Sequence, residues 1–266
     1  MTKPFRGYSA LMPRRGDARH VRVPLSMTVT QARVPCSLGC RFHARLVVVN
    51  PKGGVGKSTV STNVAGYFAS KGAQVMLGDV DKQQTSRWWL EHRPANANPI
   101  HPWDIDDDHK LKVPKGVTHV VLDTPAGLEG KALKEVLKLA TKAIVPLQAS
   151  VFDMHATHEF LHALADYKKA ARIDIGLLAM RVKDNTHSFQ HLQDFCKELP
   201  FPLLGAVRDT QNYVHLAAQG LTLFDVTPGR VQRDLQQWEP ITRWLDEPAR
   251  PQMGKGKGAS DPNAWY

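Results

Sequence analysis

The chain has 266 residues, of which 42% are apolar and 23% are charged, a composition that suits one α/β domain or at most two small ones. No apolar run approaches the roughly 18 residues of a membrane-spanning helix, so we expect no transmembrane protein. Three cysteines are too few for a disulfide scaffold and indicate a reducing, cytoplasmic setting. The net charge of +10 favours a polyanionic partner.

Most of this charge lies in the N-terminal segment. Residues 1–45 contain nine Lys and Arg against one acid, Asp17, and so carry +8 of the total. With several prolines and little hydrophobic periodicity, the segment is expected to be a disordered basic extension. A transit peptide and a translation start at Met27 remain alternatives. Residues 248–266 are rich in Gly and Lys and are expected to form a flexible tail.

Between these ends, short apolar runs alternate with helical stretches. In chain order we expect a strand at 46–50, a Gly-rich loop and a helix to about 70, a strand at 74–79, a helix at 85–92, a long connection or edge element at 94–116, a strand at 118–123, a helix at 129–140, a strand at 143–147, a helix at 152–171, a strand at 173–182, a helix at 188–198, a strand at 203–207, and helices at 211–219 and 229–245. Pro240 is expected to kink or interrupt the last helix. The alternation predicts a single α/β domain over residues 46–247, with a mostly parallel, twisted sheet and helices on both faces.

The segment after the first predicted strand carries the strongest functional signal. It reads K-G-G-V-G-K-S-T and fits the phosphate-loop pattern G-x-x-x-x-G-K-[ST], except that Pro51 stands at the first glycine. Glycines allow backbone N–H groups to surround phosphate oxygens, and the helix that follows adds its positive end. Lys57 is expected to reach the β- and γ-phosphates, and the Ser58 hydroxyl to hold Mg²⁺. The predicted nucleotide-binding residues of the loop are Lys52, Gly53, Gly54, Val55, Gly56, Lys57, Ser58 and Thr59.

The second lysine, Lys52, makes this loop resemble the deviant Walker A motif of the ParA/MinD group of ATPases. The resemblance implies a P-loop NTPase fold, with ATP and Mg²⁺ as its cofactors. It also implies a nucleotide-sandwich homodimer, in which Lys52 touches the phosphates bound by the partner chain while Lys57 acts within its own chain. Both lysines would then place positive charge where negative charge develops during phosphoryl transfer.

Two more segments support the resemblance. Residues 78–86 are similar to the family's D-x-D-P-Q segment, which implies that Asp81 positions or polarises the attacking water. Residues 120–127 are similar to the Walker B strand, which implies that Asp123 holds Mg²⁺ through water. Lys82 replaces the usual proline and Gln84 the usual glycine, so the rate of hydrolysis and the subgroup stay open.

The resemblance further implies a slow ATPase that a small cargo-adaptor protein stimulates, and whose dimer binds double-stranded DNA without sequence preference. Such a protein would be cytoplasmic and nucleoid-associated. The sequence is similar overall to the ATPases that distribute carboxysomes over the nucleoid. Plasmid or chromosome partition is the alternative, and a metal-carrier, cluster-assembly or synthetase-type ATPase is an alternative of another class. The polar C-terminal segment predicts no membrane anchor.

Non-specific DNA binding requires several cationic contacts with phosphates. The candidates outside the N-terminal extension are Arg208, Arg230, Arg233 and Arg243. Arg181 and Asp209 are weaker candidates for contacts with the base of the nucleotide. The pair Trp88–Trp89 is more typical of packing or of a dimer surface than of base stacking.

Two patterns resemble metal sites. Residues 158–162 spell H-E-x-x-H, the helix motif of zinc proteases, but no third ligand is evident. Because Phe160, Leu161 and Leu164 suit a core-facing stripe, we interpret this match as a chance one and expect no zinc protease. Cys36, Cys40 and His43 could bind a metal, although free thiols are the simpler interpretation.

Overall fold

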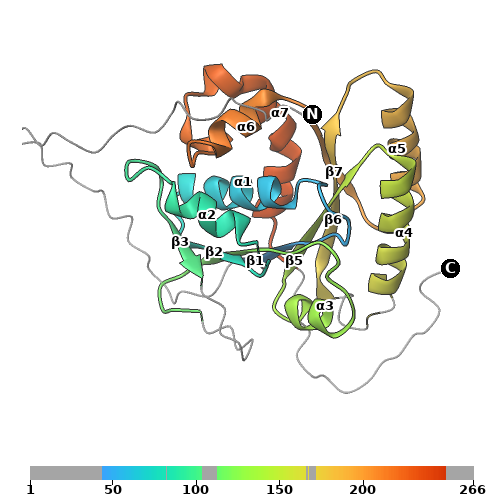
Figure 1. Ribbon diagram of the computed structural model, residues 1–266, viewed down its shortest axis with the longest axis horizontal. Helices are drawn as coiled ribbons and strands as arrows, with labels where there is room; N and C mark the ends of the chain where they lie inside the picture. The colour runs from blue at the N-terminus through green and yellow to red at the C-terminus, as the bar shows by residue number, and fades with distance from the viewer. Residues whose placement is uncertain (1–43, 82, 104–112, 166, 168–171, 250–266) are drawn as a thin grey trace, which may run out of the picture. The chain divides into compact units, whose positions relative to one another are not determined.

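The computed structural model describes residues 44–81, 83–103, 113–165, 167 and 172–249. The predicted extension up to residue 43, the tail from residue 250, and the cluster Cys36, Cys40 and His43 lie outside this range. The elements of Figure 1 are β1 (Ala44–Val48), α1 (Lys57–Ser70), β2 (Val75–Asp79), α2 (Thr85–Glu91), β3 (Ile100–Trp103), β4 (His119–Asp123), α3 (Gly130–Leu137), β5 (Lys142–Gln148), α4 (Val151–Ala165), β6 (Asp174–Val182), α5 (His187–Lys197), β7 (Leu203–Arg208), α6 (Gln211–Ala217), the 3₁₀ helix η2 (Leu223–Asp225) and α7 (Pro228–Asp246).

The strands form one seven-stranded sheet in the order β3-β2-β4-β1-β5-β6-β7, and all the paired strands are parallel. The prediction of a parallel α/β sheet is therefore confirmed. Strand β1 takes the central position, with three strands on either side. The loop that follows β1 consequently leaves the sheet at the middle of its carboxyl edge, where open α/β sheets bind their ligands.

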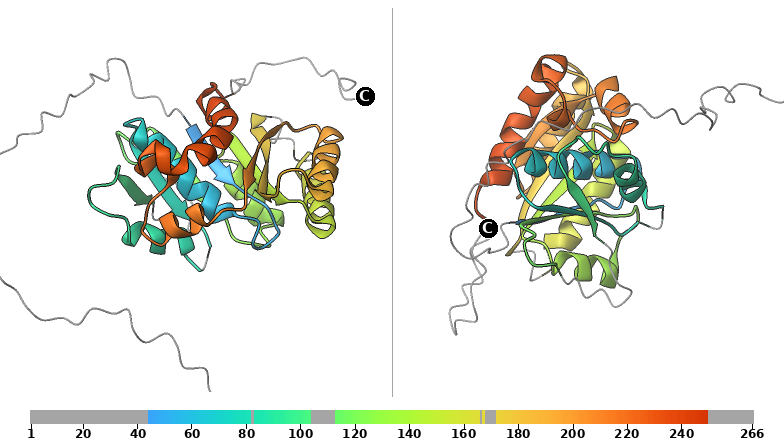
Figure 2. Two further views of the ribbon diagram at one scale, coloured as in Figure 1. Left: turned by 90° about the horizontal axis from the view of Figure 1, so that it is seen from above. Right: turned by 90° about the vertical axis from the view of Figure 1, so that its left-hand side faces the viewer.

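Helices cover both faces of the sheet. Along β1, Leu46 and Val48 point into a core shared with α1, α2 and α7, whereas Val47 belongs to the opposite core, shared with α3, α4 and α5. In the right-hand view of Figure 2, α1 and α7 lie above the strands and α3 lies below them. Because β1 is buried on both sides, its sequence is a continuous apolar run rather than an alternating one.

Most predicted elements are present with ends shifted by a few residues. The 94–116 connection contains the edge strand β3, which has four residues including Pro102. The interruption expected at Pro240 is wrong: α7 continues through this residue, and its non-helical dihedral angles occur at Val231. Pro240 is exposed, and so is Gln236, whose carbonyl loses its helical donor. Water can satisfy that carbonyl, and the helix continues past the proline.

The opposite edge strand, β7, pairs irregularly with β6. The register shifts between Leu177 and Leu178 and again between Ala179 and Val182. Helix α7 packs against β7, with Val207 of the strand and Ile241 of the helix in the same buried core. Both edge strands of the described sheet therefore depart from a long, regular strand.

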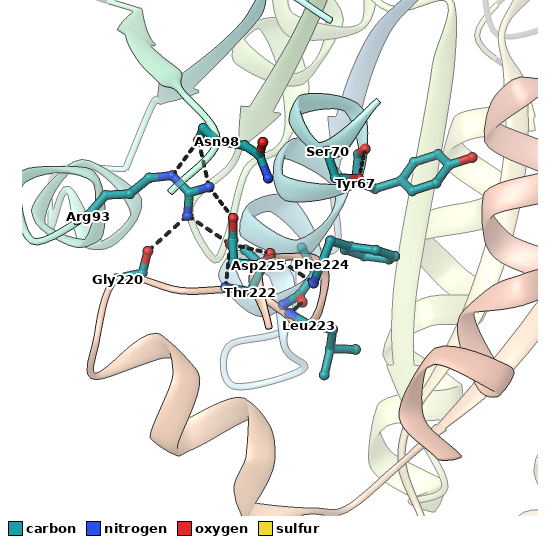
Figure 3. A network of polar contacts seen from close by, with 10 residues as sticks. Tyr67, Ser70, Arg93, Asn98, Gly220, Thr222, Leu223, Phe224 and Asp225 are labelled. Atoms are coloured by element: carbon teal, nitrogen blue, oxygen red, sulfur yellow. Dashed lines mark hydrogen bonds and ion pairs between the residues drawn. The ribbon is translucent and has the colours of Figure 1, made fainter. Parts of the chain in front are cut away.

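A buried ion pair joins the end of α2 to η2 (Figure 3). The guanidinium of Arg93 donates to both carboxylate oxygens of Asp225, at 3.0 and 2.7 Å, and to the carbonyls of Asn98 and Gly220. Asp225 also accepts from the backbone N–H and the hydroxyl of Thr222. Every strong polar group of this network has a partner, so the pair can remain buried. It fixes the chain between α6 and α7 against the α1–α2 side of the sheet.

Within the described residues, no helix has both the length and the apolar character needed to cross a bilayer.

Candidate nucleotide-binding site

The loop between β1 and α1 has the backbone of a phosphate cradle. Gly54 and Gly56 adopt left-handed conformations, with φ of 75° and 97°, which residues with a Cβ atom rarely adopt. Gly56 also lies under Met180 of β6, whose Cε atom would be 2.9 Å from a Cβ atom at position 56. Gly56 is the N-cap of α1, and no side chain caps the helix. The first N–H groups of α1 are therefore free to bind an anion.

Side chains from distant strands hold this loop in place. Asn50, which is fully buried, donates to the carbonyl of Pro146 and the hydroxyl of Thr157, and its amide oxygen accepts from the N–H of Lys52. Gln148, at the end of β5, donates to the carbonyl of Gly54 at 2.9 Å. The loop is thus preorganised by β5 and α4 and not only by its own glycines.

Lys57 lies at the first position of α1 with its ammonium folded over the loop. Its Nζ atom donates to the carbonyl of Lys52 at 2.8 Å. Burial lowers the pKa of Lys57, while the carboxylates of Asp123 and Asp81 act in the opposite direction. The three residues predicted from separate motifs therefore interact electrostatically around one loop.

Asp123 ends β4 and is almost completely buried. Its carboxylate accepts from Ser86 at 2.5 Å and from Ser61 at 3.2 Å, and it also interacts with the hydroxyl of Ser58. Burial raises the pKa of Asp123, and these serine hydroxyls only partly counteract that rise. A cation beside this carboxylate would favour its ionised form.

Asp79 and Asp81 follow the neighbouring strand β2, and Asp79 is the Cα partner of Asp123 across the sheet. The carboxylate of Asp79 accepts from the N–H groups of Asp81 and Ser86, so it fixes both the loop and the start of α2. Asp79 therefore organises the backbone at this point. Asp81 lies beyond it, where its charge acts on Lys57.

Lys52 forms an ion pair within its own chain. Its Nζ atom lies 3.8 Å from Oδ1 of Asp153 on α4, and the Lys52 side chain is 43% exposed. The two residues before Asp153, Val151 and Phe152, are 73% and 80% exposed, which is unusual for large apolar side chains. The carboxylate that pairs with the loop lysine and these two exposed apolar residues therefore belong to the same first turn of α4.

The donor set fits a nucleotide triphosphate with Mg²⁺. Uncapped N–H groups and two lysines would face the phosphates, and the Ser58 hydroxyl and the Asp123 carboxylate are oxygen ligands of the kind that Mg²⁺ prefers.

The model of the CobQ/CobB/MinD/ParA nucleotide-binding domain matches residues 46–223, two thirds of the chain. The chain belongs to this family. The matched range begins in β1 and ends in η2, and so contains all the residues that hold the loop.

Curated members of the family resemble this chain over parts of its length. A carboxysome distribution protein A from Gloeobacter kilaueensis is 33% identical over 122 residues, which cover 44% of this chain and 55% of that protein. A protein of the same name from Halothiobacillus neapolitanus is 24% identical over 68% of this chain and 87% of its own length. The chromosome-partitioning ATPase Soj of Thermus thermophilus is 26% identical over 52% and 68%. This chain thus spans about half of the Gloeobacter protein.

Solved structures of the ParA/MinD type share the fold. MinD from Aquifex aeolicus superposes with a TM-score of 0.62 at 16% identity, over 78% of this chain and 98% of that one. A complex of a McdA variant from Cyanothece with ATP gives 0.57 at 17% identity, over 76% and 97%. The agreement concerns the fold, which is that of ParA/MinD-type P-loop proteins.

The structure divides the arginines predicted to bind DNA. Arg208, Arg230 and Arg233 line one hollow of about 510 Å³ at the start of α7, whereas Arg243 lies almost three turns farther along the helix. Arg208 is bound to the fully buried Asp234, with 2.5 Å between Nε and Oδ1. Arg233 forms an exposed ion pair with Asp184.

The other sequence candidates have separate outcomes. Arg181 and Asp209 are exposed and pair with each other at 3.3 Å. Trp89 is buried in the core, as a packing role predicts, while Trp88 is exposed and its ring contacts that of His92 in a tilted arrangement. The stripe expected on α4 is confirmed, because Phe160, Leu161 and Leu164 are buried.

Sequence reasoning missed the residues that hold the site together, which are Asn50, Ser61, Ser86, Gln148, Asp153 and Thr157. Only Asn50 left a usable signal, since a polar residue there follows directly after the apolar run 46–49. The others become relevant through contacts between segments far apart in the sequence.

Proposed function

We propose that this chain is a Mg²⁺-dependent ATPase that dimerises around ATP, binds DNA without sequence preference as a dimer, and positions a cargo over the nucleoid. The observation that carries the proposal is the convergence of Lys57, Asp81 and Asp123 on one glycine-rich loop, with a second lysine, Lys52, at its entrance. Membership of the family and relatives named for carboxysome distribution support it.

The residues take distinct roles in the proposed reaction. The N–H groups at the start of α1 bind phosphate oxygens, and Lys57 exchanges the Lys52 carbonyl for the β- and γ-phosphates. Asp81 orients the water that attacks the γ-phosphorus. Ser58 and Asp123 are the residues that would hold Mg²⁺, which would supply positive charge to neutralise the phosphates. Burial keeps these interactions strong by limiting solvent screening.

The exposed first turn of α4 provides the proposed dimer surface. Val151 and Phe152 present apolar area beside Lys52, and Lys52 points its ammonium to the surface with one carboxylate partner, Asp153. In the dimer, Lys52 leaves Asp153 for the more highly charged phosphates bound by the other copy. Burial of Phe152 against that copy contributes to the free energy of dimerisation.

DNA binding is assigned to the hollow at the start of α7. Arg230 and Arg233 are exposed there, and the weak surface pairing of Arg233 with Asp184 is easily exchanged for a phosphate. Arg208, committed to the buried Asp234, holds α7 in position. A dimer doubles the number of phosphate contacts and so links DNA affinity to the nucleotide state.

The decisive experiment is co-sedimentation with double-stranded DNA in the presence of ATP, ADP or no nucleotide, over a series of salt concentrations. We expect retention with ATP only, and a steep loss as salt rises. Retention that is independent of nucleotide would contradict the switch and indicate simple electrostatic binding.

The cargo is proposed to be the carboxysome, with a small adaptor protein that stimulates hydrolysis. The relationship to Soj favours chromosome partition as the second candidate. Deletion of the gene in cells with fluorescently labelled carboxysomes and chromosomes distinguishes the two candidates. Carboxysomes should cluster in the first case, and cells without chromosomes should appear in the second.

A further inference from the structure

Helix α4 carries three imidazoles that the proposed ATPase does not use, those of His155, His158 and His162, and the last two are in contact. His158 and His162 are four positions apart and so lie on the same side of the helix, one turn from each other. Their Nε2 atoms are 3.1 Å apart, and the ring centroids are 4.3 Å apart. His158 is partly exposed and His162 is exposed, so both can be reached from solvent.

This separation matches the distance between two nitrogen ligands of one metal ion. Zn–N bonds of about 2.0–2.1 Å that meet at roughly 90–109° place the two nitrogens about 2.9–3.4 Å apart. The 3.1 Å between the two Nε2 atoms falls within that interval. The helix backbone already holds the ligands at the required spacing, so binding costs little additional ordering.

A carboxylate supports the arrangement from the far side of one ring. Oε1 of Glu159 lies 3.5 Å from Nδ1 of His158. Carboxylates commonly lie near the second ring nitrogen of a metal-binding histidine, where they orient the imidazole. Phe195 of α5, whose ring centroid lies 6.2 Å from that of His158, limits how far the imidazole can turn away.

We propose that His158 and His162 bind one divalent transition-metal ion per chain, of the Zn²⁺ or Ni²⁺ type that imidazole nitrogen favours, with water molecules completing its coordination. Among the residues that the structure describes, no group of three or more His, Cys, Asp or Glu is arranged to hold a metal. The site is therefore a two-ligand surface site and not the three-ligand centre of a zinc protease.

The chain contains a matched control. His187 and His191 have the same spacing on α5 and are both exposed, but the contacts of the described residues include none between these two rings. His187 is the first residue of its helix, where the backbone frays. A site that depends on the geometry of α4 should distinguish the two pairs.

The test is a calorimetric titration of the full-length chain with Zn²⁺ and, separately, Ni²⁺, without nucleotide. Every protein compared carries Cys36→Ser and Cys40→Ser, so that these thiols cannot compete for the ion. We expect one ion per chain, an affinity loss of at least about tenfold in His158→Ala and in His162→Ala, and a smaller loss in Glu159→Gln. The double variant His187→Ala/His191→Ala should bind as the parent does.

A second readout is thermal unfolding with and without the ion. Because the pair is held at this spacing only in the folded helix, Zn²⁺ should raise the Tm of the parent and of the α5 control but not that of His158→Ala. Unchanged affinity in His158→Ala, or an equal loss in the α5 control, would overturn the proposal. A cooperative thermal transition of each variant without the ion verifies that it is folded, so the test does not depend on the proposed ATPase function.

Discussion

Lys52 and Asp153 pair across the entrance of the phosphate loop, with 3.8 Å between ammonium and carboxylate, on a part of α4 that also exposes Phe152. The lysine that is proposed to act on another chain is thus held by a single carboxylate of its own chain. The Lys52 side chain is partly exposed whereas Asp153 is largely buried, so Lys52 leaves this pair only for a stronger anionic partner such as the phosphates of ATP.

Replacing Lys52 by Ala should abolish ATP-dependent dimerisation while most ATP binding remains, because Lys57 and the loop N–H groups still hold the phosphates. Light scattering with a non-hydrolysable ATP analogue measures the dimer, and a fluorescent nucleotide measures binding. Asp153→Asn is the companion variant: it releases Lys52 and should dimerise at least as well as the parent. A Lys52→Ala protein that dimerises normally would refute the action of Lys52 across the dimer.

Asp81→Ala should trap the ATP-bound dimer on DNA. The variant lacks the carboxylate that orients water but keeps Lys57, Ser58 and Asp123, so we expect turnover to fall by at least about 100-fold with ATP binding retained. Phosphate release and DNA retention after ATP is removed measure the two effects. Turnover equal to that of the parent would exclude Asp81 from the reaction.

Asp123→Asn should stabilise the nucleotide-free protein and abolish Mg²⁺-dependent hydrolysis. Burial raises the pKa of Asp123 in the folded chain, so its contribution to stability is full below about pH 4 and is lost as the pH rises through the folded value. At neutral pH the uncharged amide of Asn avoids the cost of burying a charge. We expect the free energy of unfolding to rise by about 1 kcal/mol, which raises the Tm of a domain of this size by a few degrees. Scanning calorimetry at pH 4 and pH 7 tests the sign, since the difference between the two proteins should shrink in acid.

Arg230→Ala and Arg208→Ala should fail in different ways. Arg230→Ala should reduce the slope of log K for DNA binding against log salt concentration by about one unit for each phosphate that the side chain neutralises. The free energy of unfolding should not change. Arg208→Ala removes the guanidinium from Asp234, which is completely buried, and should lower the free energy of unfolding by about 2–3 kcal/mol. Urea unfolding measures the stability of each variant, and DNA binding over a salt series measures its affinity. If both variants lost DNA affinity equally while keeping full stability, Arg208 would belong to the DNA interface.

Arg93→Ala should destabilise the fold by about 3–5 kcal/mol, because Asp225 would keep a buried charge without its cation. Burial alone would raise the pKa of Asp225, but the hydrogen bonds from Arg93 and Thr222 outweigh it and hold that pKa below its usual value. The stability that the pair provides is therefore present at neutral pH and is lost as the pH falls below about 4.

Urea unfolding of Arg93→Ala at pH 7 and pH 3 measures this effect, and the loss should be smaller at pH 3. Lys71→Ala is the control, because its pair with Asp246 is exposed and should contribute less than about 1 kcal/mol. Equal losses in the two variants at pH 7 would contradict the assignment.

The sequence predicted the residues proposed to react better than the residues that hold them in position. Lys57, Asp81 and Asp123 each follow a readable strand, and the ends of parallel strands meet at one edge, so their proximity was predictable. Ser86 could not be found in this way, since its bond to Asp123 depends on the angle at which α2 leaves its loop.

Local rules also failed where tertiary contacts decide the outcome. Arg208 reads as a free surface cation until α7 brings Asp234 against it. Gln84 adopts a left-handed φ of 47°, a conformation that a residue with a Cβ atom rarely takes and that the sequence pattern does not predict. The hydrogen bonds that Asp79 makes to the loop and to α2 supply the constraint.

The short strand β3 with Pro102 and the irregular strand β7 bear on how copies of this chain can meet. Proline lacks the backbone N–H group that donates to a neighbouring strand. Shifts of register interrupt the row of backbone N–H and C=O groups with which an incoming strand would pair. Copies therefore have little opportunity to join by extending their sheets. This suits the proposed dimer, which would form around the phosphate loop under the control of nucleotide and would have to separate again after hydrolysis.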